Sequence, residues 1–252
     1  MRLTDYPAGI FLLSILVLSA SVWVGAILRG EKELQGESRE DYGVVLAAAL
    51  TLLGLIIGFS FSMATSRYDA RKNFEEAEAN AIGTEYVRVD FLPTADAAAA
   101  KKLLKTYLNQ RVVWYRERSS QDIRQIDAQT ARLQNELWSA VKTPAAATPS
   151  PILGLVVSGM NDVLNSQGYT QAGWWNRIPP PAWLLMFVIA VLCNGMIGFR
   201  EGKRKLRFVR PIILPVIVSI SFYMIADIDS PRSGLVRVVP QNLLSLAASL
   251  PE

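Results

Sequence analysis

Four long apolar stretches divide the chain, at residues 8–28, 44–63, 178–199 and 208–226. The first three contain no charged side chain. Each stretch has about the 20 residues that a helix needs to cross the hydrocarbon core of a bilayer. The pattern therefore predicts four transmembrane helices. A cleaved signal peptide is the rival interpretation of the first stretch, but its length and weakly basic lead favour a retained helix.

The second apolar stretch predicts a helix that continues into water. No proline occurs between Pro7 and Pro93, and no turn cluster follows residue 63. Beyond residue 67 small and apolar residues such as Ala70, Phe74 and Ala77 recur every three or four positions, the spacing of a helix–helix seam. We expect this helix to end before Pro93, because the residue before a proline resists helical angles.

Residues 67–177 predict a soluble helical domain. Leu104, Leu108 and Trp114 share one stripe with the aliphatic stem of Arg111, and a further heptad-like pattern follows at residues 121–142. Residues 143–151 are rich in proline, alanine and threonine and predict a loop, after which residues 152–165 predict a shorter helix. No segment has the alternating pattern of a strand.

The predicted fold class is all-α. It is a polytopic membrane protein with four transmembrane helices and a helical soluble domain inserted between the second and the third. Residues 8–66 hold transmembrane helices 1 and 2, residues 67–177 the soluble domain, and residues 178–226 transmembrane helices 3 and 4. Residues 227–252 predict a C-terminal turn and a short amphipathic helix.

The composition argues against several classes of function. The chain has no histidine, which removes the usual zinc sites and every imidazole-dependent triad. Neither glycine-rich phosphate-binding motif occurs. The single cysteine, Cys193, lies in an apolar stretch, so a disulfide framework is excluded. We therefore predict that the protein is not an enzyme and holds neither a cofactor nor a metal.

The net charge of +4 is concentrated locally. Six Lys and Arg residues fall within residues 200–210, which favours contact with the lipid bilayer and its anionic headgroups. Nucleic acid is not expected as a partner, because no nucleic-acid-binding motif accompanies them. Residues 29–41 carry three more basic residues. By the positive-inside rule both loops are cytoplasmic, which predicts an inner (plasma) membrane protein with an extracytoplasmic soluble domain.

Small and polar residues within the apolar stretches are candidates for helix packing or for a pore. Gly54 and Gly58 form a small-xxx-small pair, and Asn194 is predicted to hydrogen-bond to a neighbouring helix. Close packing is the plainer interpretation of the glycine pair. The alternative is a pore-lining helix, because Ser60 and Ser62 place hydroxyl groups near the end of the span.

Acidic residues form two further candidate sites for an ion or for gating. Asp227 and Asp229 adjoin a Pro-x-Ser-Gly turn at a membrane boundary. Their plainer interpretation is structural, with Asp229 capping the turn and Asp227 paired with Arg232. Glu78 and Glu85 belong to an acidic run that is typical of a solvated helix surface, and a cation site is the alternative.

Several blocks of this sequence resemble a bacterial membrane-protein family described as having a bestrophin-like domain. The resemblance covers nearly the whole chain. It implies two spans, a helical domain that continues from the second span, and two further spans. Bestrophins are oligomeric, calcium-activated anion channels whose second helix lines the pore, so the resemblance also implies a homo-oligomer. The matching residues are Phe59, Arg67, Tyr68, Arg71, Glu78, Asn80, Ala81, Ile82, Gly83, Thr84, Leu92, Pro93, Asn161, Asp162, Asp227, Asp229, Pro231, Gly234 and Leu235.

Two hypotheses of function follow. The first is a homo-oligomeric channel for inorganic ions, with small anions expected, whose pore is lined by the second helix. Phe59 and Phe61 would form an apolar constriction near Gly58, Ser60 and Ser62 would supply hydroxyls, and Arg67 and Arg71 would form a basic ring. The second is a non-conducting scaffold or sensor that binds a partner through the seam at residues 70–84. A membrane enzyme that uses Asp227 and Asp229 is a third, weaker alternative.

Overall fold

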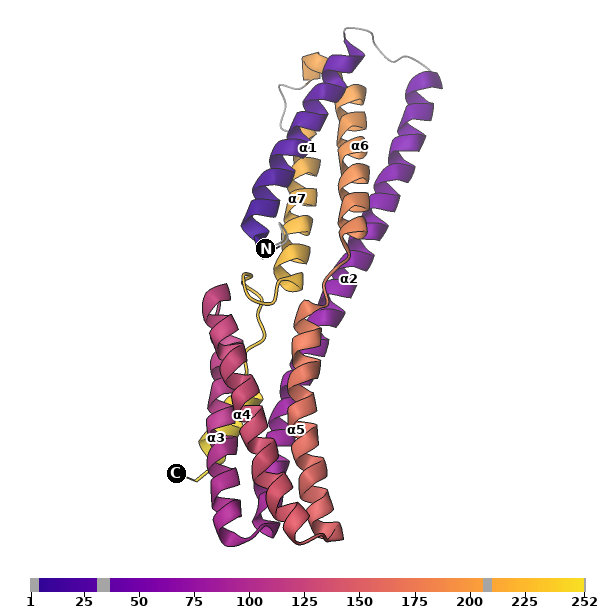
Figure 1. Ribbon diagram of the computed structural model, residues 1–252. Helices are drawn as coiled ribbons and strands as arrows, with labels where there is room; N and C mark the ends of the chain where they lie inside the picture. The colour runs from indigo at the N-terminus through magenta and orange to yellow at the C-terminus, as the bar shows by residue number, and fades with distance from the viewer. Residues whose placement is uncertain (1–4, 31–36, 206–209, 252) are drawn as a thin grey trace. The chain divides into compact units, whose positions relative to one another are not determined.

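The computed structural model describes residues 5–30, 37–205 and 210–251, which form helices and contain no strand. They divide into two compact units (Figure 1). The membrane unit comprises residues 1–67 and 177–237, and the soluble unit comprises residues 68–176 and 238–252. The all-α fold class is confirmed. Parts of the two basic loops used to predict the topology, residues 31–36 and 206–209, lie outside the described residues.

Four helices in the described part of the chain are long and apolar enough to span a membrane, as the sequence predicts. They are α1 (Pro7–Arg29), α2 (Glu37–Arg88), α6 (Pro180–Lys205) and α7 (Arg210–Asp229). In the membrane unit α1, α6 and α7 pack together, and α2 lies against α6, where the Tyr42 hydroxyl donates to the carbonyl of Met196 at 3.2 Å (Figure 1).

A close helix crossing in the membrane unit joins α1 and α6 through glycines. A Cβ atom at Gly25 of α1 would overlap the carbonyl of Gly195, and one at Gly198 of α6 would overlap the carbonyl of Val22. The Ser21 hydroxyl donates to the carbonyl of Val191 across the same crossing at 2.7 Å. In lipid, where the hydrophobic effect does not drive helix association, small residues of this kind let two backbones approach and gain dispersion contacts.

Helix α2 runs from Glu37 to Arg88 without a break, as the absence of proline predicts. A short 3-10 helix, η2 (Val89–Phe91), follows, and Leu92 before Pro93 is extended. The steric demand of proline on its predecessor accounts for this end. The helix thus contributes its first part to the membrane unit and its part from Tyr68 onward to the soluble unit.

The soluble unit is a helical bundle. Besides the second part of α2 it contains α3 (Thr94–Arg116), α4 (Ser120–Ala147), α5 (Pro151–Trp175) and α8 (Gln241–Ser249). Its apolar core includes Ile82, Leu104, Tyr107, Leu137 and Met160. Residues 238–252, which the sequence analysis treats as part of a C-terminal segment, belong to this unit.

Two helices of the soluble unit are longer than the sequence predicts. Helix α4 continues through Pro144 to Ala147, inside the stretch predicted as a loop. Helix α5 continues past residue 165 to Trp175 although Gly168 and Gly173 lie within it. Gly173 is a packing residue, because a Cβ there would lie 2.7 Å from the ring of Phe74. The helix needs only a small side chain at this position.

Candidate functional site

The membrane part of α2 packs one face and leaves the opposite face open. Leu46, Leu53, Ser60 and Ala64 are buried and recur at helical spacing. Around Gly54 and Gly58 no atom of the described structure lies within 4 Å of a built Cβ. These two glycines therefore meet no other described helix, whereas the glycine packing in the described part of the membrane unit occurs between α1 and α6.

The residues predicted to line a pore divide between these two faces. Phe59 is 64% exposed, and Phe61 and Ser62 are exposed as well, whereas Ser60 is buried on the packed face. Residues two apart on a helix point about 200° away from each other, so Ser60 and Ser62 cannot face one opening together. The expectation of paired hydroxyls is corrected on this ground. Gly58, Phe59 and Ser62 remain on the open face.

Asn194 is buried in the membrane unit, but its side-chain amide donates to the carbonyl of Ala190, one turn back in the same helix, at 2.8 Å. Its side-chain oxygen has no hydrogen-bond partner among the described residues. The prediction that Asn194 hydrogen-bonds to a neighbouring helix is therefore wrong, because its amide bonds within its own helix. Ser21 and Tyr42 instead donate side-chain hydrogen bonds to carbonyls of α6 from neighbouring helices.

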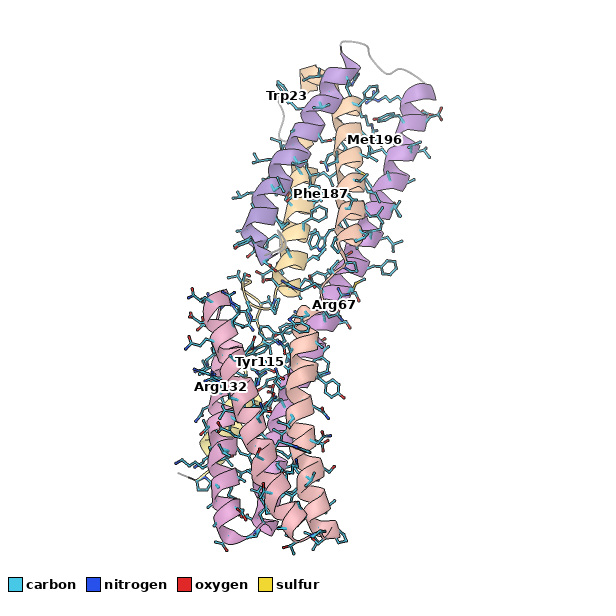
Figure 2. All side chains as sticks on the ribbon, viewed as in Figure 1. Trp23, Arg67, Tyr115, Arg132, Phe187 and Met196 are labelled. Carbon is cyan, nitrogen blue, oxygen red and sulfur yellow. The ribbon has the colours of Figure 1, made fainter. Side chains whose placement is uncertain are left out.

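Asp229 contacts the backbone just before α6 and two arginines, Arg67 and Arg177, in the membrane unit. Both of its carboxylate oxygens accept the backbone N–H of Ile178, at 3.2 Å each. Arg67, labelled on α2 in Figure 2, places a guanidinium nitrogen 3.9 Å from the same carboxylate, and Arg177 donates to the backbone carbonyl of Asp229 at 2.5 Å. Arg177 also pairs with Asp5. Asp229 is thus occupied by contacts within its own unit.

Asp227 caps the turn that follows α7. Its two oxygens accept the backbone N–H groups of Leu235 at 2.7 Å and Val236 at 2.8 Å. Gly234 is required beside it, because a Cβ there would lie 2.5 Å from the carbonyl of Asp227. The structural interpretation of the two aspartates agrees with these contacts, but the residues exchange roles: Asp227 caps the turn and Asp229 faces an arginine.

Arg71 and Glu75 stabilise helix ends in the soluble unit. Arg71 is 1% exposed and donates to the carbonyls of Gly173 and Asn176 at the C-terminal end of α5, at 3.2 and 3.4 Å. Glu75 accepts the backbone N–H of Leu243 in the first turn of α8 at 2.9 Å. A cation at a helix C-terminus and a carboxylate at a helix N-terminus each interact favourably with the helix dipole and so stabilise the helix. Arg71 is therefore turned into the bundle, which corrects its assignment to an open basic ring.

Glu78 forms a buried ion pair with Arg111 of α3. Both side chains are fully buried. Tyr115, which Figure 2 labels inside the soluble unit, donates to the Glu78 carboxylate at 3.2 Å, and Thr170 of α5 does so at 3.1 Å. Burial lowers the pKa of Arg111 and the Glu78 carboxylate raises it, with a net pKa above the usual value. The expectation that Glu78 lies on a solvated surface is wrong, because Arg111 and two hydroxyls replace water.

Glu85 is buried without such partners. Neither carboxylate oxygen has a hydrogen-bond partner among the described residues. Burial raises the pKa of Glu85 to about 8, with Arg88 lowering that pKa and Asp162 raising it. The solvated-surface expectation therefore fails for Glu85 too.

Sequence reasoning missed the partners of these acidic residues. Arg111 carries the clearest signal, because it lies on the apolar stripe of α3, and a charged residue at a core position needs a buried partner. Thr170 carries no such signal. Among the residues that the structure describes, no three acidic or cysteine side chains gather closely enough to hold a metal ion.

Comparison with known proteins identifies the family. The model of the Bestrophin-like domain family matches residues 12–243. This chain belongs to the Bestrophin-like domain family. No curated protein matches the sequence.

Solved structures share the Bestrophin-like fold with this chain. The crystal structure of a bacterial bestrophin homolog from Klebsiella pneumoniae is 15% identical, with a TM-score of 0.63, covering 95% of this chain and 99% of that one. A point mutant of that protein gives 12% identity and a TM-score of 0.63, covering 95% and 97%. A structure described only as a mutant membrane protein gives 15% identity and a TM-score of 0.64, covering 96% and 98%. The chain therefore has the fold of a multi-pass bacterial bestrophin homolog.

Proposed function

We propose that this protein is a homo-oligomeric ion channel of the bacterial inner membrane and that α2 lines its pore. The observation that supports this most is the open face of α2 in the membrane unit. That face carries Val44, Leu55 and Phe59, all more than half exposed, opposite the packed face of Leu46 and Leu53. A helix that buries only one face within its own chain is available to surround an axis shared with other copies.

Within this proposal the open-face residues have distinct roles. Phe59 forms the apolar constriction, where a ring of aromatic side chains gates by excluding water, with Phe61 beside it. Ser62 supplies the hydroxyl at the end of the span. Gly54 and Gly58 let copies of α2 approach one another, because each is bare within its own chain.

Small anions are the proposed permeant ions, on the strength of the family resemblance. Of the two arginines in the expected basic ring, only Arg67 is available for this role. Its side chain is 18% exposed and lies 3.9 Å from Asp229, whereas Arg71 is turned into the soluble unit. The soluble unit is proposed to lie outside the cytoplasm, because the basic loops favour that orientation.

Part of the seam at residues 70–84, the surface proposed for the scaffold alternative, packs inside the chain. Phe74, at the centre of the seam at residues 70–84, packs against Gly173 of α5, and Ala81 packs against the core of the soluble unit. These two residues are partly buried by packing inside the chain, whereas Ala77 and Thr84 of the same seam are exposed. The seam is therefore only in part available to a partner.

A cysteine-accessibility measurement in planar bilayers tests the channel. The purified protein is reconstituted in a Cys193→Ala background, and Ser62→Cys is compared with its matched control Ser60→Cys. A membrane-impermeant, charged thiol reagent is expected to reduce the current through Ser62→Cys and to leave Ser60→Cys unchanged. Absence of current at every pH, calcium level and voltage would contradict the channel. A block of Ser60→Cys equal to that of Ser62→Cys would contradict the proposed orientation of α2.

A further inference from the structure

Glu85 of α2 lies directly against the bare backbone of α5 in the soluble unit. A Cβ atom at Gly159 would overlap the Glu85 carboxyl group and would lie 2.8 Å from a guanidinium nitrogen of Arg88. The glycine therefore leaves the space that the carboxyl occupies. Because Glu85 is 0% exposed, the carboxyl group forms part of the α2–α5 interface itself.

The other acidic residues on the buried side of α2 have hydrogen-bond donors, whereas Glu85 has none among the described residues. Glu75 accepts a backbone N–H and the side-chain amide of Asn242, and Glu78 accepts from Arg111 and two hydroxyls. Both oxygens of Glu85 lack a hydrogen-bond partner in the described part of the chain. An ionised carboxylate in such a place is strongly disfavoured, whereas a protonated one is tolerated.

Two charged groups act on Glu85 besides its burial. Burial has the largest effect and raises the pKa, Arg88 on the same helix lowers it, and Asp162 on α5 raises it, which gives a pKa of about 8. Arg88 lies close enough to lower the pKa of the carboxyl, but neither carboxylate oxygen accepts a hydrogen bond from it among the described contacts. The carboxyl therefore changes charge close to neutral pH.

We propose that Glu85 is a proton-operated latch, which holds α5 against α2 at Gly159 while it is protonated and releases that contact when it ionises. In the closed state the neutral carboxyl group sits against the Gly159 backbone. On ionisation the proton passes to solvent water and no other bond changes. The resulting carboxylate leaves the apolar contact for water, and the α2–α5 packing at Gly159 loosens.

Hydrogen–deuterium exchange of the full-length protein in detergent tests the latch. Exchange is measured at about one pH unit below and above pH 8 and corrected for the intrinsic pH dependence of exchange. In the wild type, α5 amides around Gly159 are expected to lose protection at the higher pH. Glu85→Gln, which keeps the neutral shape and cannot ionise, is expected to abolish that loss. The matched control Glu76→Gln changes an exposed carboxylate on the same helix and is expected to behave as the wild type.

The pH dependence of stability provides a second measurement with a defined sign. The native pKa of Glu85 lies above its unfolded value of 4.5, so the native state holds the extra proton between the two values. Its contribution to stability is therefore full below about pH 4.5, falls as pH rises, and is lost above about pH 8. The ratio of unfolding equilibrium constants, wild type over Glu85→Gln, is expected to rise up to tenfold per pH unit in that interval.

Two results would overturn the latch. One is α5 protection in the wild type that does not change across pH 8. The other is a ratio of unfolding constants that is independent of pH, which would mean that Glu85 stays ionised and pairs with Arg88. A pH-dependent current would be a further consequence that rests on the proposed channel function. A protein that carries no current would refute the channel, while the exchange measurement would still decide the latch.

Discussion

The buried pair of Glu78 and Arg111 offers the sharpest test of how the soluble unit is held together. We consider the substitution Arg111→Met, which keeps an unbranched apolar stem and removes the guanidinium group. It leaves the Glu78 carboxylate fully buried, with only the hydroxyls of Tyr115 and Thr170 as hydrogen-bond donors. It also removes the guanidinium that lies 4.5 Å from the ring centre of Trp114.

The expected cost follows from these contacts. Removing one partner of a buried ion pair destabilises a protein by about 3–5 kcal/mol, because the remaining charge stays in a low-dielectric site. The two hydroxyl donors remain, each worth about 1 kcal/mol, so the lower end of the range applies. We therefore expect Arg111→Met to lower the free energy of unfolding by about 3 kcal/mol.

Removing the second charge should recover part of that loss. In the double variant Glu78→Gln with Arg111→Met no ionised group is left in the core, and the amide can still accept from Tyr115 or Thr170. The double variant is expected to be more stable than Arg111→Met alone. This recovery would show that the stranded carboxylate, and not the lost packing of Arg111, causes the main effect.

Urea unfolding of the full-length protein in detergent, followed by tryptophan fluorescence, measures these differences. Trp114 and Trp174 lie 4.7 Å apart in the soluble unit and report on its core. Arg116→Met is the matched control, because Arg116 is exposed on the same helix and should change stability by no more than about 0.5 kcal/mol. If Arg111→Met shifts the transition no more than this control, the structural role assigned to the pair is wrong.

Three further substitutions test the membrane unit. Gly198→Ala places a methyl group on the carbonyl of Val22, so it is expected to cost about 1–3 kcal/mol in thermal unfolding. Gly54→Ala, which meets nothing within 4 Å in the chain, should leave the fold unchanged; equal effects of the two would contradict the α1–α6 crossing. Asp227→Asn replaces one of two acceptor oxygens with a donor and leaves a partly buried backbone N–H without its acceptor, so about 1 kcal/mol is expected. Unchanged proteolysis of the segment after α7 would argue against this cap.

The sequence by itself determined the elements of this protein. Apolar stretches long enough to cross a bilayer specify four spans, because a helix of about 20 mostly apolar residues satisfies its own backbone hydrogen bonds in the hydrocarbon core. The absence of proline between residue 44 and Pro93 predicted that α2 continues unbroken out of the apolar stretch, although its start at Glu37 lies within the stretch predicted as a loop. Helical spacing of apolar residues likewise identified a helical soluble unit. These features depend on neighbours along the chain, so a sequence displays them.

Only the tertiary structure decided which polar groups face each other. Glu78 and Glu85 lie two helical turns apart on one face of α2, and the sequence does not distinguish them. One lies opposite Arg111 and the other lies opposite Gly159. The first therefore forms an ion pair, whereas burial raises the pKa of the second to about 8. The charge state of a buried group depends on the dielectric and the donors around it, and residues far apart in the chain supply both.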